Sequence, residues 1–159
     1  MIQIGAVLPA VPVQRLGAHG PEWVPVPALA PGRRMVLFSV PGAFTPACSA
    51  RHLPGFIENA AAFKAKGVDL LACIAVNDAY VMAAWGEKNH VDDRVLMLAD
   101  GNGTFTQAVG LAEDGTPYGM GLRSRRYALV ADNGKVTHLF VEEPGAYEVS
   151  AASHVLAHI

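Results

Sequence analysis

The sequence has 159 residues, of which 52% are hydrophobic, and this length and composition suffice for one domain with a substantial buried core. Its 12 basic and 14 acidic side chains give a net charge of −2, and the basic residues gather nowhere except between positions 123 and 126. This charge distribution argues against a nucleic-acid-binding protein.

The amino-terminal thirty residues are rich in proline, glycine and valine, and they predict short extended pieces and turns that end at Pro31-Gly32. They lack the basic start, continuous apolar centre and cleavage site that are typical of a secretory signal. No run approaches the roughly 18 apolar residues of a membrane span. We therefore expect a soluble cytoplasmic protein without a membrane partner.

Predicted strands and helices alternate through the middle of the chain. Three apolar runs have the length of strands buried on both faces: residues 35–40, 69–76 and 94–100. Each is followed by a segment with helical spacing or helix-capping residues: 46–66, 79–88 and 103–110. Pro54 lies inside the first helix, where a proline removes a hydrogen bond, so we expect a kink that sets the first turn apart.

The carboxyl-terminal third contains a hairpin signal. After a glycine-rich loop at 113–121, the segment RYALVADNGKVTHLFV contains two strand-like runs joined by Asp132-Asn133-Gly134. Because hairpin strands are antiparallel, the sheet is expected to be mixed.

The chain ends in a short predicted helix at 151–158, which Ser150 could cap. Repeats, linkers and low-complexity segments are absent from the sequence. The whole chain, residues 1–159, therefore predicts one α/β domain with a mixed sheet flanked by helices.

Cys48 stands at an informative place in the segment VPGAFTPACSARHLPGF. Thr45 followed by Pro46 is typical of a helix start, which makes Cys48 the third helical residue. Backbone N–H groups and the helix dipole stabilise an anion there, and the thiolate is the nucleophilic form of cysteine. Ligands of open α/β sheets usually bind beyond a strand end, where the next helix starts. The alternative is that Cys48 is a small buried hydrophobe, as most free cysteines are.

The segment PGAFTPAC resembles the peroxiredoxin signature, in which Pro41, Thr45 and Cys48 occupy the first, fifth and eighth places. The segments HLPGF, KAKGV, VND and RYALVADNG are similar to the peroxiredoxin-five or plant type II subfamily, so the resemblance runs from about Met35 to Val141. It implies a thioredoxin-like fold and the reduction of hydrogen peroxide or alkyl hydroperoxides, with no metal or organic cofactor.

The resemblance also implies four active-site roles: Cys48 as the peroxidatic cysteine, Thr45 as a hydrogen-bonding partner of peroxide and thiolate, Pro41 as a shield, and Arg126 as the active-site arginine. Such donors are needed where negative charge moves onto a leaving oxygen. Arg126 precedes a strand that we expect to lie antiparallel to residues 35–40, which would bring it to the edge near Cys48.

Two alternatives stay open for these roles. Arg126 could be a solvated charge at a strand end, with Arg123 or Arg125 in the catalytic place. Thr45 could act only as a helix cap, although one hydroxyl both donates and accepts, so that capping and substrate contact are compatible.

Regeneration of the active thiol is expected to need an external reductant. A sulfenic acid on Cys48 must be resolved by a second thiol before more peroxide oxidises it further. Some members of the subfamily carry that cysteine about where this chain has Ser150, and Cys73 lies in an apolar run where thiols are inert. We therefore expect a one-cysteine mechanism completed by glutathione, glutaredoxin or thioredoxin.

Other residues are assigned simpler roles. His52 lies four residues after Cys48 and is expected to line the pocket, because two ligands are too few for a zinc site. Four other histidines are not clustered in the sequence: His90, His138, His154 and His158. Trp85, Tyr80 and Met82 are expected to be packing or interface residues. Phe44 and the glycine-rich loop are candidates for the subunit contact of a homodimer, which the family often forms.

Two other functions use the same residues. A thiol–disulfide oxidoreductase or glutathione-transfer protein would need the same reactive thiol, although the Cys-x-x-Cys pair typical of such enzymes is absent. A binding or holdase-like subunit would leave Cys48 chemically silent.

Overall fold

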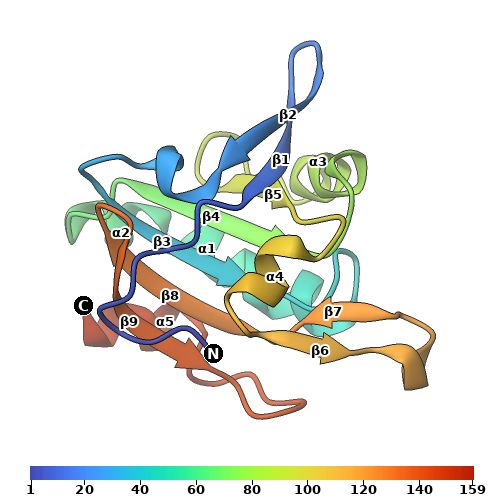
Figure 1. The fold of residues 1–159 in the computed structure, drawn as a ribbon. Helices are drawn as coiled ribbons and strands as arrows, with labels where there is room; N and C mark the ends of the chain where they lie inside the picture. Colours follow the sequence, from blue (N-terminus) through green and yellow to red (C-terminus); the bar gives the residue numbers. More distant parts are fainter.

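A seven-stranded mixed sheet with helices on both faces forms the centre of the computed structural model, which describes residues 1–159 (Figure 1). Its strand order is β2-β1-β5-β4-β3-β8-β9. The parallel part consists of three strands: β3 (Arg34–Ser39), β4 (Leu70–Ala75) and β5 (Leu96–Ala99). All three coincide with the apolar runs of the sequence, and the predicted mixed sheet is confirmed.

Helical segments follow each parallel strand. They are η2 (Cys48–His52), α1 (Leu53–Glu58), α2 (Ala60–Ala65), α3 (Ala79–Lys88) and α4 (Thr104–Ala108). The side chain of Asp78, just before the predicted helix at 79–88, accepts a hydrogen bond from the amide of Val81 and caps α3. The helix expected at 46–66 is divided into three parts. No helix has both the length and the apolar composition to cross a bilayer.

An antiparallel hairpin completes one side of the sheet. Its strands, β8 (Tyr127–Asp132) and β9 (Lys135–Val141), meet at a turn in which Asn133 and Gly134 both have positive φ, as the hairpin signal predicts. Strand β8 pairs antiparallel with β3, and Ser39 lies opposite Tyr127. This register brings the residue before β8, Arg126, to the carboxyl end of β3, as expected.

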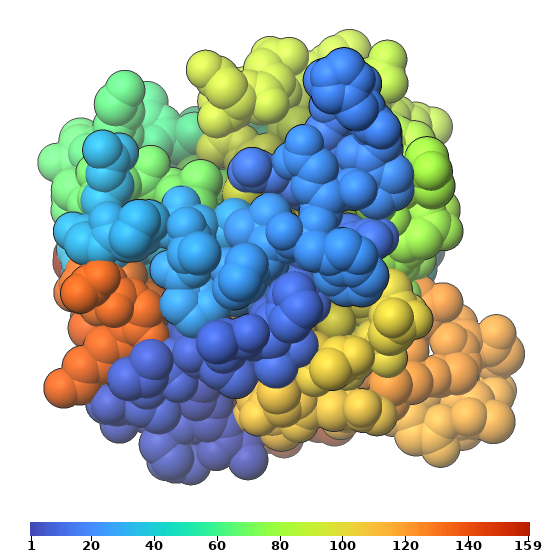
Figure 2. All heavy atoms as spheres, turned by 45° about the horizontal axis from the view of Figure 1, so that its top comes forward, coloured from blue at the N-terminus to red at the C-terminus, as the bar shows by residue number.

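The opposite side of the sheet is built from the amino-terminal residues. A second hairpin, β1 (Pro12–Gly17) and β2 (Gly20–Pro25), joins β5 through a pairing of Gln14 with Ala99, and a 3₁₀ turn, η1 (Val26–Leu29), follows it. The residues before β1 spread over the adjacent face of the molecule, where Figure 2 shows them in dark blue beside the yellow segment around residue 105. The predicted extended pieces and turns are therefore confirmed.

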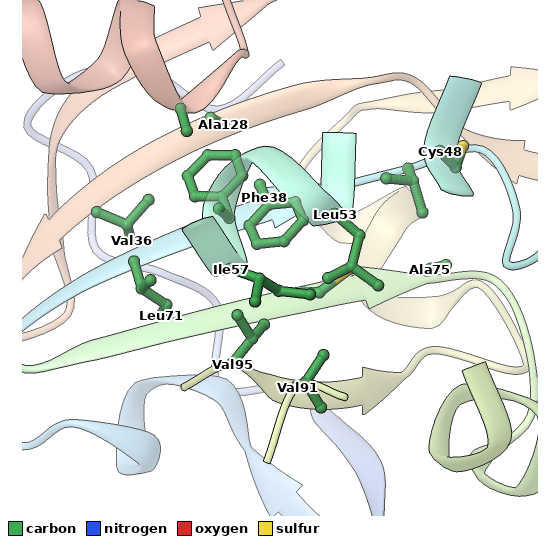
Figure 3. Close-up of a cluster of buried hydrophobic side chains, with 14 of the residues drawn as sticks. Val36, Phe38, Cys48, Leu53, Ile57, Leu71, Ala75, Val91, Val95 and Ala128 are labelled. Carbon is green, nitrogen blue, oxygen red and sulfur yellow. The ribbon is translucent and has the colours of Figure 1, made fainter. Parts of the chain in front are cut away.

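Two hydrophobic cores lie on opposite faces of the sheet, because side chains alternate along each strand. In β3, Val36 and Phe38 belong to the core covered by α1, α2, α3 and α5 (Ala152–His158). Met35 and Leu37 belong to the core covered by α4, η1 and the amino-terminal segment. Figure 3 shows the first core, with Cys48 at one end of it.

Two local predictions are corrected. The glycine-rich loop contains a separate two-stranded sheet, β6 (Ala112–Asp114) and β7 (Leu122–Ser124), around the short turn η3 (Thr116–Tyr118). The amino end of α5 has no side-chain cap, because the helix begins one residue later than predicted and Ala151 occupies the cap position. The Ser150 hydroxyl donates to the Glu142 carboxylate at 2.6 Å.

Candidate active site

Cys48 lies where the chain turns from the carboxyl end of β3 into a helix. The helical run begins at Pro46, and in the turn just before it Phe44 has a positive φ of 64°. The Cys48 side chain has an exposed fraction of 0% and packs into the first core. The predicted position at the third helical residue is therefore confirmed, but the sulfur lies beneath the surface.

The first helical turn has an unusual form. Residues Cys48–His52 are π-helical, and the amide of Leu53 donates to the carbonyl of Cys48, five residues back. Pro54, next in α1, has no amide hydrogen, so it cannot continue the α-helical pattern of bonds. The expected separation of the first turn is thus present as a π-helical turn, a distortion found often at functional sites.

Arg126 contacts the sulfur directly. Its Nη2 donates to Cys48 Sγ at 3.2 Å, and its Nη1 lies 2.9 Å from Nδ1 of His52. The other two arginines of the basic cluster bind elsewhere: Arg123 donates to backbone carbonyls of Met120 and Val76, and Arg125 donates to that of Glu142. Of the three arginines considered from the sequence, the structure brings only Arg126 to the thiol.

His52 is buried and uncharged between two partners. Its Nε2 lies 3.0 Å from the carbonyl oxygen of Ser150, which can only accept, so Nε2 carries the proton and Nδ1 accepts from Arg126. Burial, followed by the charge of Arg126, lowers the pKa of His52 to about 3. His52 therefore lies against the reactive centre as a hydrogen-bonding group, and no group of three or more potential metal ligands surrounds it.

Thr45 forms a local backbone hydrogen bond, and Pro41 lines a cavity near Arg126. The Thr45 hydroxyl donates to the Gly42 carbonyl at 2.7 Å and binds neither a helix amide nor the sulfur, so the predicted cap is not formed. Pro41 lines a cavity of about 200 Å³ together with Arg126. A larger hollow of about 740 Å³ beside Trp23 contains no thiol.

Cys73 is a core residue, as predicted. It lies in β4 opposite Phe38 of β3, with an exposed fraction of 0%, and both cysteines are free. Burial, followed by the charge of Cys48, raises the pKa of the Cys73 thiol. A thiol held protonated is a poor nucleophile.

The chain is similar to known proteins in sequence and in fold. The family model described as Redoxin matches residues 9–156. Peroxiredoxin-2C of Oryza sativa subsp. japonica is 51% identical over 144 residues, which are 91% of this chain and 84% of that protein. A crystal structure of reduced Prx3 in complex with H₂O₂ from Vibrio vulnificus superposes with a TM-score of 0.96, at 51% identity, over 99% of both chains. The chain belongs to the peroxiredoxin family.

This membership confirms the predicted thioredoxin-like α/β fold. Length varies among the relatives. Chloroplastic peroxiredoxin-2E of Arabidopsis thaliana is 49% identical over 135 residues, which are 84% of this chain but only 58% of that protein. This peroxiredoxin therefore corresponds to about three fifths of the length of that relative.

Sequence reasoning missed the network that holds His52. The Glu142 carboxylate accepts hydrogen bonds from the amides of Glu148, Val149 and Ser150 and from the Ser150 hydroxyl. Burial acts to raise the pKa of Glu142, but these hydrogen bonds outweigh it and hold the pKa below its usual value. The carboxylate thereby holds in place the Ser150 carbonyl, which accepts the hydrogen bond from Nε2 of His52.

Tyr147 is a second residue that the sequence did not reveal. Its ring lies edge-on to His52, with 5.2 Å between ring centroids, and the Arg51 guanidinium lies 4.8 Å from the ring centroid. Its hydroxyl donates to the Arg51 carbonyl at 3.2 Å. The segment after β9 thus forms one wall of the site, which no local sequence pattern indicates.

Two of the three α3 residues expected to be packing or interface residues are packing residues. Trp85 and Met82 are buried, and the Trp85 indole donates to the hydroxyl of Ser49, beside Cys48. Tyr80 is exposed, which leaves the interface role as its prediction.

The histidines expected to be separate are partly clustered. The rings of His154 and His158 stack on α5 with 4.1 Å between centroids, and Phe140 of β9 lies against both of them and against His138. The stacking of His154 on His158 follows from their spacing of four residues on a helix, whereas His138 is joined to them only through Phe140, by the packing of β9 against α5.

Proposed function

We propose that this peroxiredoxin is a thiol-dependent peroxidase that reduces hydrogen peroxide and alkyl hydroperoxides. The contact between Arg126 and the Cys48 sulfur supports this proposal most strongly. A guanidinium at this distance stabilises the thiolate, and the helix start adds backbone N–H groups. The names of the relatives agree with this function, since peroxiredoxins are among them.

The reaction requires that charge move from sulfur to oxygen. The thiolate of Cys48 attacks one peroxide oxygen, the S–O bond forms as the O–O bond breaks, and the other oxygen leaves as hydroxide or alkoxide and takes a proton. Cys48 becomes a sulfenic acid. Arg126 remains beside the sulfur and donates to the departing negative charge, which is the stabilisation that this step needs.

Thr45 is proposed to orient the peroxide. Its hydroxyl proton is used by the Gly42 carbonyl, so the lone pairs of its oxygen stay available to accept the O–H of a peroxide. Pro41 is proposed to exclude water from the same side, since it lines the cavity beside Arg126.

The burial of the sulfur sets a condition on this proposal. Because Cys48 has no exposed surface, peroxide reaches it only when the side chains between it and the cavity move apart. Hydrogen peroxide is little larger than water, so it would need a smaller displacement of the first helical turn than an alkyl hydroperoxide.

The reductant is proposed to be an external thiol. Cys73 is buried in β4, and Ser150 stands about where the subfamily resemblance places a resolving cysteine, so glutathione, alone or with glutaredoxin, or thioredoxin would reduce the sulfenic acid. Mass spectrometry after stoichiometric peroxide tests this. We expect an adduct of Cys48 with the added thiol, whereas an internal disulfide with Cys73 would contradict the one-cysteine mechanism.

Rapid-mixing kinetics test the peroxidase function itself. We expect fast oxidation by hydrogen peroxide that is lost in Cys48→Ser. Peroxide reactivity no greater than that of a free thiol, together with rapid disulfide exchange, would instead indicate a thiol–disulfide oxidoreductase. Inertness toward both reagents would leave a binding or holdase-like subunit.

A homodimer in the cytoplasm is proposed as the working form. Phe44 has an exposed fraction of 49% and Tyr118, in the glycine-rich loop, one of 82%, so both are available for a contact between subunits. Light scattering of the protein and of Phe44→Ser tests the dimer, and a monomeric mass for the unmodified protein would exclude it. Fractionation of the source cells tests the compartment.

A further inference from the structure

The ring of Tyr147 has two guanidinium groups over it at one wall of the active-site cavity. The guanidinium carbon of Arg51 lies 4.8 Å from the ring centroid, and that of Arg126 lies 5.9 Å from it. The ring is also edge-on to His52, with 5.2 Å between the ring centroids. Tyr147 therefore lies against both side chains that continue the hydrogen-bonded chain from Cys48, those of Arg126 and His52.

An aromatic face attracts a cation, because the electrons of the ring make that face negative. The attraction acts within about 6 Å of the ring centroid, and the Arg126 guanidinium lies inside this range. A contact of this kind consumes no N–H donor, so Arg126 keeps its hydrogen bond to Cys48 Sγ and its contact with Nδ1 of His52. His52 is neutral and does not compete for the ring as a cation.

Tyr147 is itself held in place from two directions. Its hydroxyl donates to the carbonyl of Arg51 at 3.2 Å, within the π-helical turn that begins at Cys48. The next residue along the chain, Glu148, donates its amide to the Glu142 carboxylate at 2.7 Å. The ring is thereby tied both to the turn that carries the sulfur and to the carboxylate that anchors the segment after β9.

Carboxylates in the same cavity offer Arg126 an alternative partner. Glu113 and Glu143 line the cavity together with Arg126 and Tyr147, and neither carboxylate forms a hydrogen bond or an ion pair. A guanidinium binds a carboxylate strongly, so an Arg126 side chain free to swing could leave the sulfur for one of them. A contact that favours the sulfur-bound position counters this alternative.

We propose that Tyr147 is a positioning residue for the peroxidase reaction, and that the face of its ring holds the Arg126 guanidinium where it donates to the Cys48 sulfur. The inference rests on the proposed peroxidase function and adds no chemical step to it. Tyr147 acts through Arg126 rather than on the reacting atoms. Because the ring face is the group that acts, phenylalanine can replace this tyrosine, whereas an aliphatic side chain cannot.

A double-mutant cycle between Tyr147 and Arg126 tests this role. We expect Tyr147→Leu to slow the oxidation of Cys48 by hydrogen peroxide about threefold to tenfold, the size of one lost cation–π contact, and Tyr147→Phe to keep the rate. In the Arg126→Ala background, Tyr147→Leu should slow oxidation no further, because the group on which the ring acts is gone. Stopped-flow measurement gives each second-order rate constant.

Phe140→Leu is the matched control. Phe140 is a half-buried aromatic residue outside the cavity, and its ring lies against those of His154 and His158, so its loss likewise removes a ring from a group of polar side chains. It should be oxidised at the rate of the unmodified protein. Equal slowing in this control or in Tyr147→Phe, an unchanged rate in Tyr147→Leu, or a full additional effect in the Arg126→Ala background would overturn the proposal.

Fluorinated phenylalanines at position 147 decide the question if Tyr147→Leu does not fold. Each added fluorine withdraws electrons from the ring face while the shape of the ring is nearly kept, so the rate of oxidation should fall stepwise with the number of fluorine atoms. A rate independent of fluorination would exclude the ring face as the group that acts. Failure of the peroxidase function would be seen separately, because the unmodified protein would then not react rapidly with hydrogen peroxide.

Discussion

At the residue scale, the site depends on a short chain of hydrogen bonds from Cys48 through Arg126 and His52 to the Ser150 carbonyl. Each member determines what the next one can donate or accept. Because His52 is neutral with its proton on Nε2, its Nδ1 holds the guanidinium without adding a second positive charge next to the sulfur.

Replacement of Arg126 is predicted to slow oxidation by peroxide while the fold is kept. Arg126→Ala removes a charged donor from the sulfur and from the leaving oxygen, and loss of one such donor costs about a hundredfold or more in rate. Stopped-flow measurement of the second-order rate constant checks this, with Arg15→Gln as a control at a surface ion pair. An unchanged rate would show that Arg126 has no part in the chemistry.

His52 is predicted to make the protein less stable in acid. The pKa of His52 is about 3 in the folded protein and ordinarily 6.5. Between these pH values the unfolded chain therefore binds a proton at His52 that the folded protein does not bind. The free energy of unfolding therefore falls as the pH drops from about 6.5 toward 3, by at most about 1.4 kcal/mol per pH unit.

Urea unfolding of the wild type and His52→Gln at pH 7.5, 6 and 5 checks this prediction. Glutamine keeps a donor and an acceptor but does not titrate, so the variant should lose less stability than the wild type as the pH falls. His19→Gln, a change at an exposed histidine, should follow the wild type. Parallel pH curves for all three proteins would contradict the assignment.

At the element scale, two segments at the site depart from regular secondary structure. The π-helical turn at Cys48–His52 contains His52, and the irregular segment at 143–151 lies against that residue. The helix start at Pro46 was predictable because its signal is local. The π-helical turn was not, because it depends on tertiary contacts as well as on Pro54, and Glu142 was missed because its partners lie six to eight residues away.

Glu142→Gln is predicted to loosen the segment that carries Ser150. The carboxylate accepts four hydrogen bonds, and an amide has only one oxygen to offer, so we expect a loss of about 1–3 kcal/mol in the free energy of unfolding. Hydrogen exchange should also quicken at 143–158. Glu143→Gln, at a neighbouring carboxylate without hydrogen bonds, is the control, and equal exchange in both variants would rule out the anchoring role.

The first helical turn is predicted to open in solution. The Cys48 sulfur has no exposed surface, so alkylation by iodoacetamide must follow local opening and should be slower than alkylation of an exposed thiol. Peptide mass spectrometry against time checks this, and Cys73 should remain unlabelled in the native protein. A Cys48 that resists the reagent until global unfolding would contradict access by peroxide.

At the scale of the whole molecule, one sheet is shared by two cores, and the sequence predicted this arrangement well. The apolar runs of β3 and β4 and the hairpin turn at Asn133-Gly134 are strong local signals. The separate two-stranded sheet was less predictable, because β6 and β7 are three residues long and their apolar content is low. Register, rather than any local signal, brings Arg126 across the sheet to Cys48.

The shared sheet predicts that the chain unfolds as a single unit. Trp85 belongs to one core and Trp23 is an exposed residue of β2, so Trp23→Phe leaves fluorescence as a report on the first core alone. Circular dichroism follows the whole sheet. We expect the two urea transitions to coincide, whereas separate midpoints would divide the chain into two units.

The anchoring of Ser150 also limits how this peroxiredoxin could evolve. Its hydroxyl donates to Glu142 while its carbonyl accepts from His52, so a cysteine acquired at this position would remove the hydroxyl bond that helps to fix the segment. Under the proposed one-cysteine mechanism, gain of an internal resolving partner here would therefore demand compensating changes at Glu142 and in the loop.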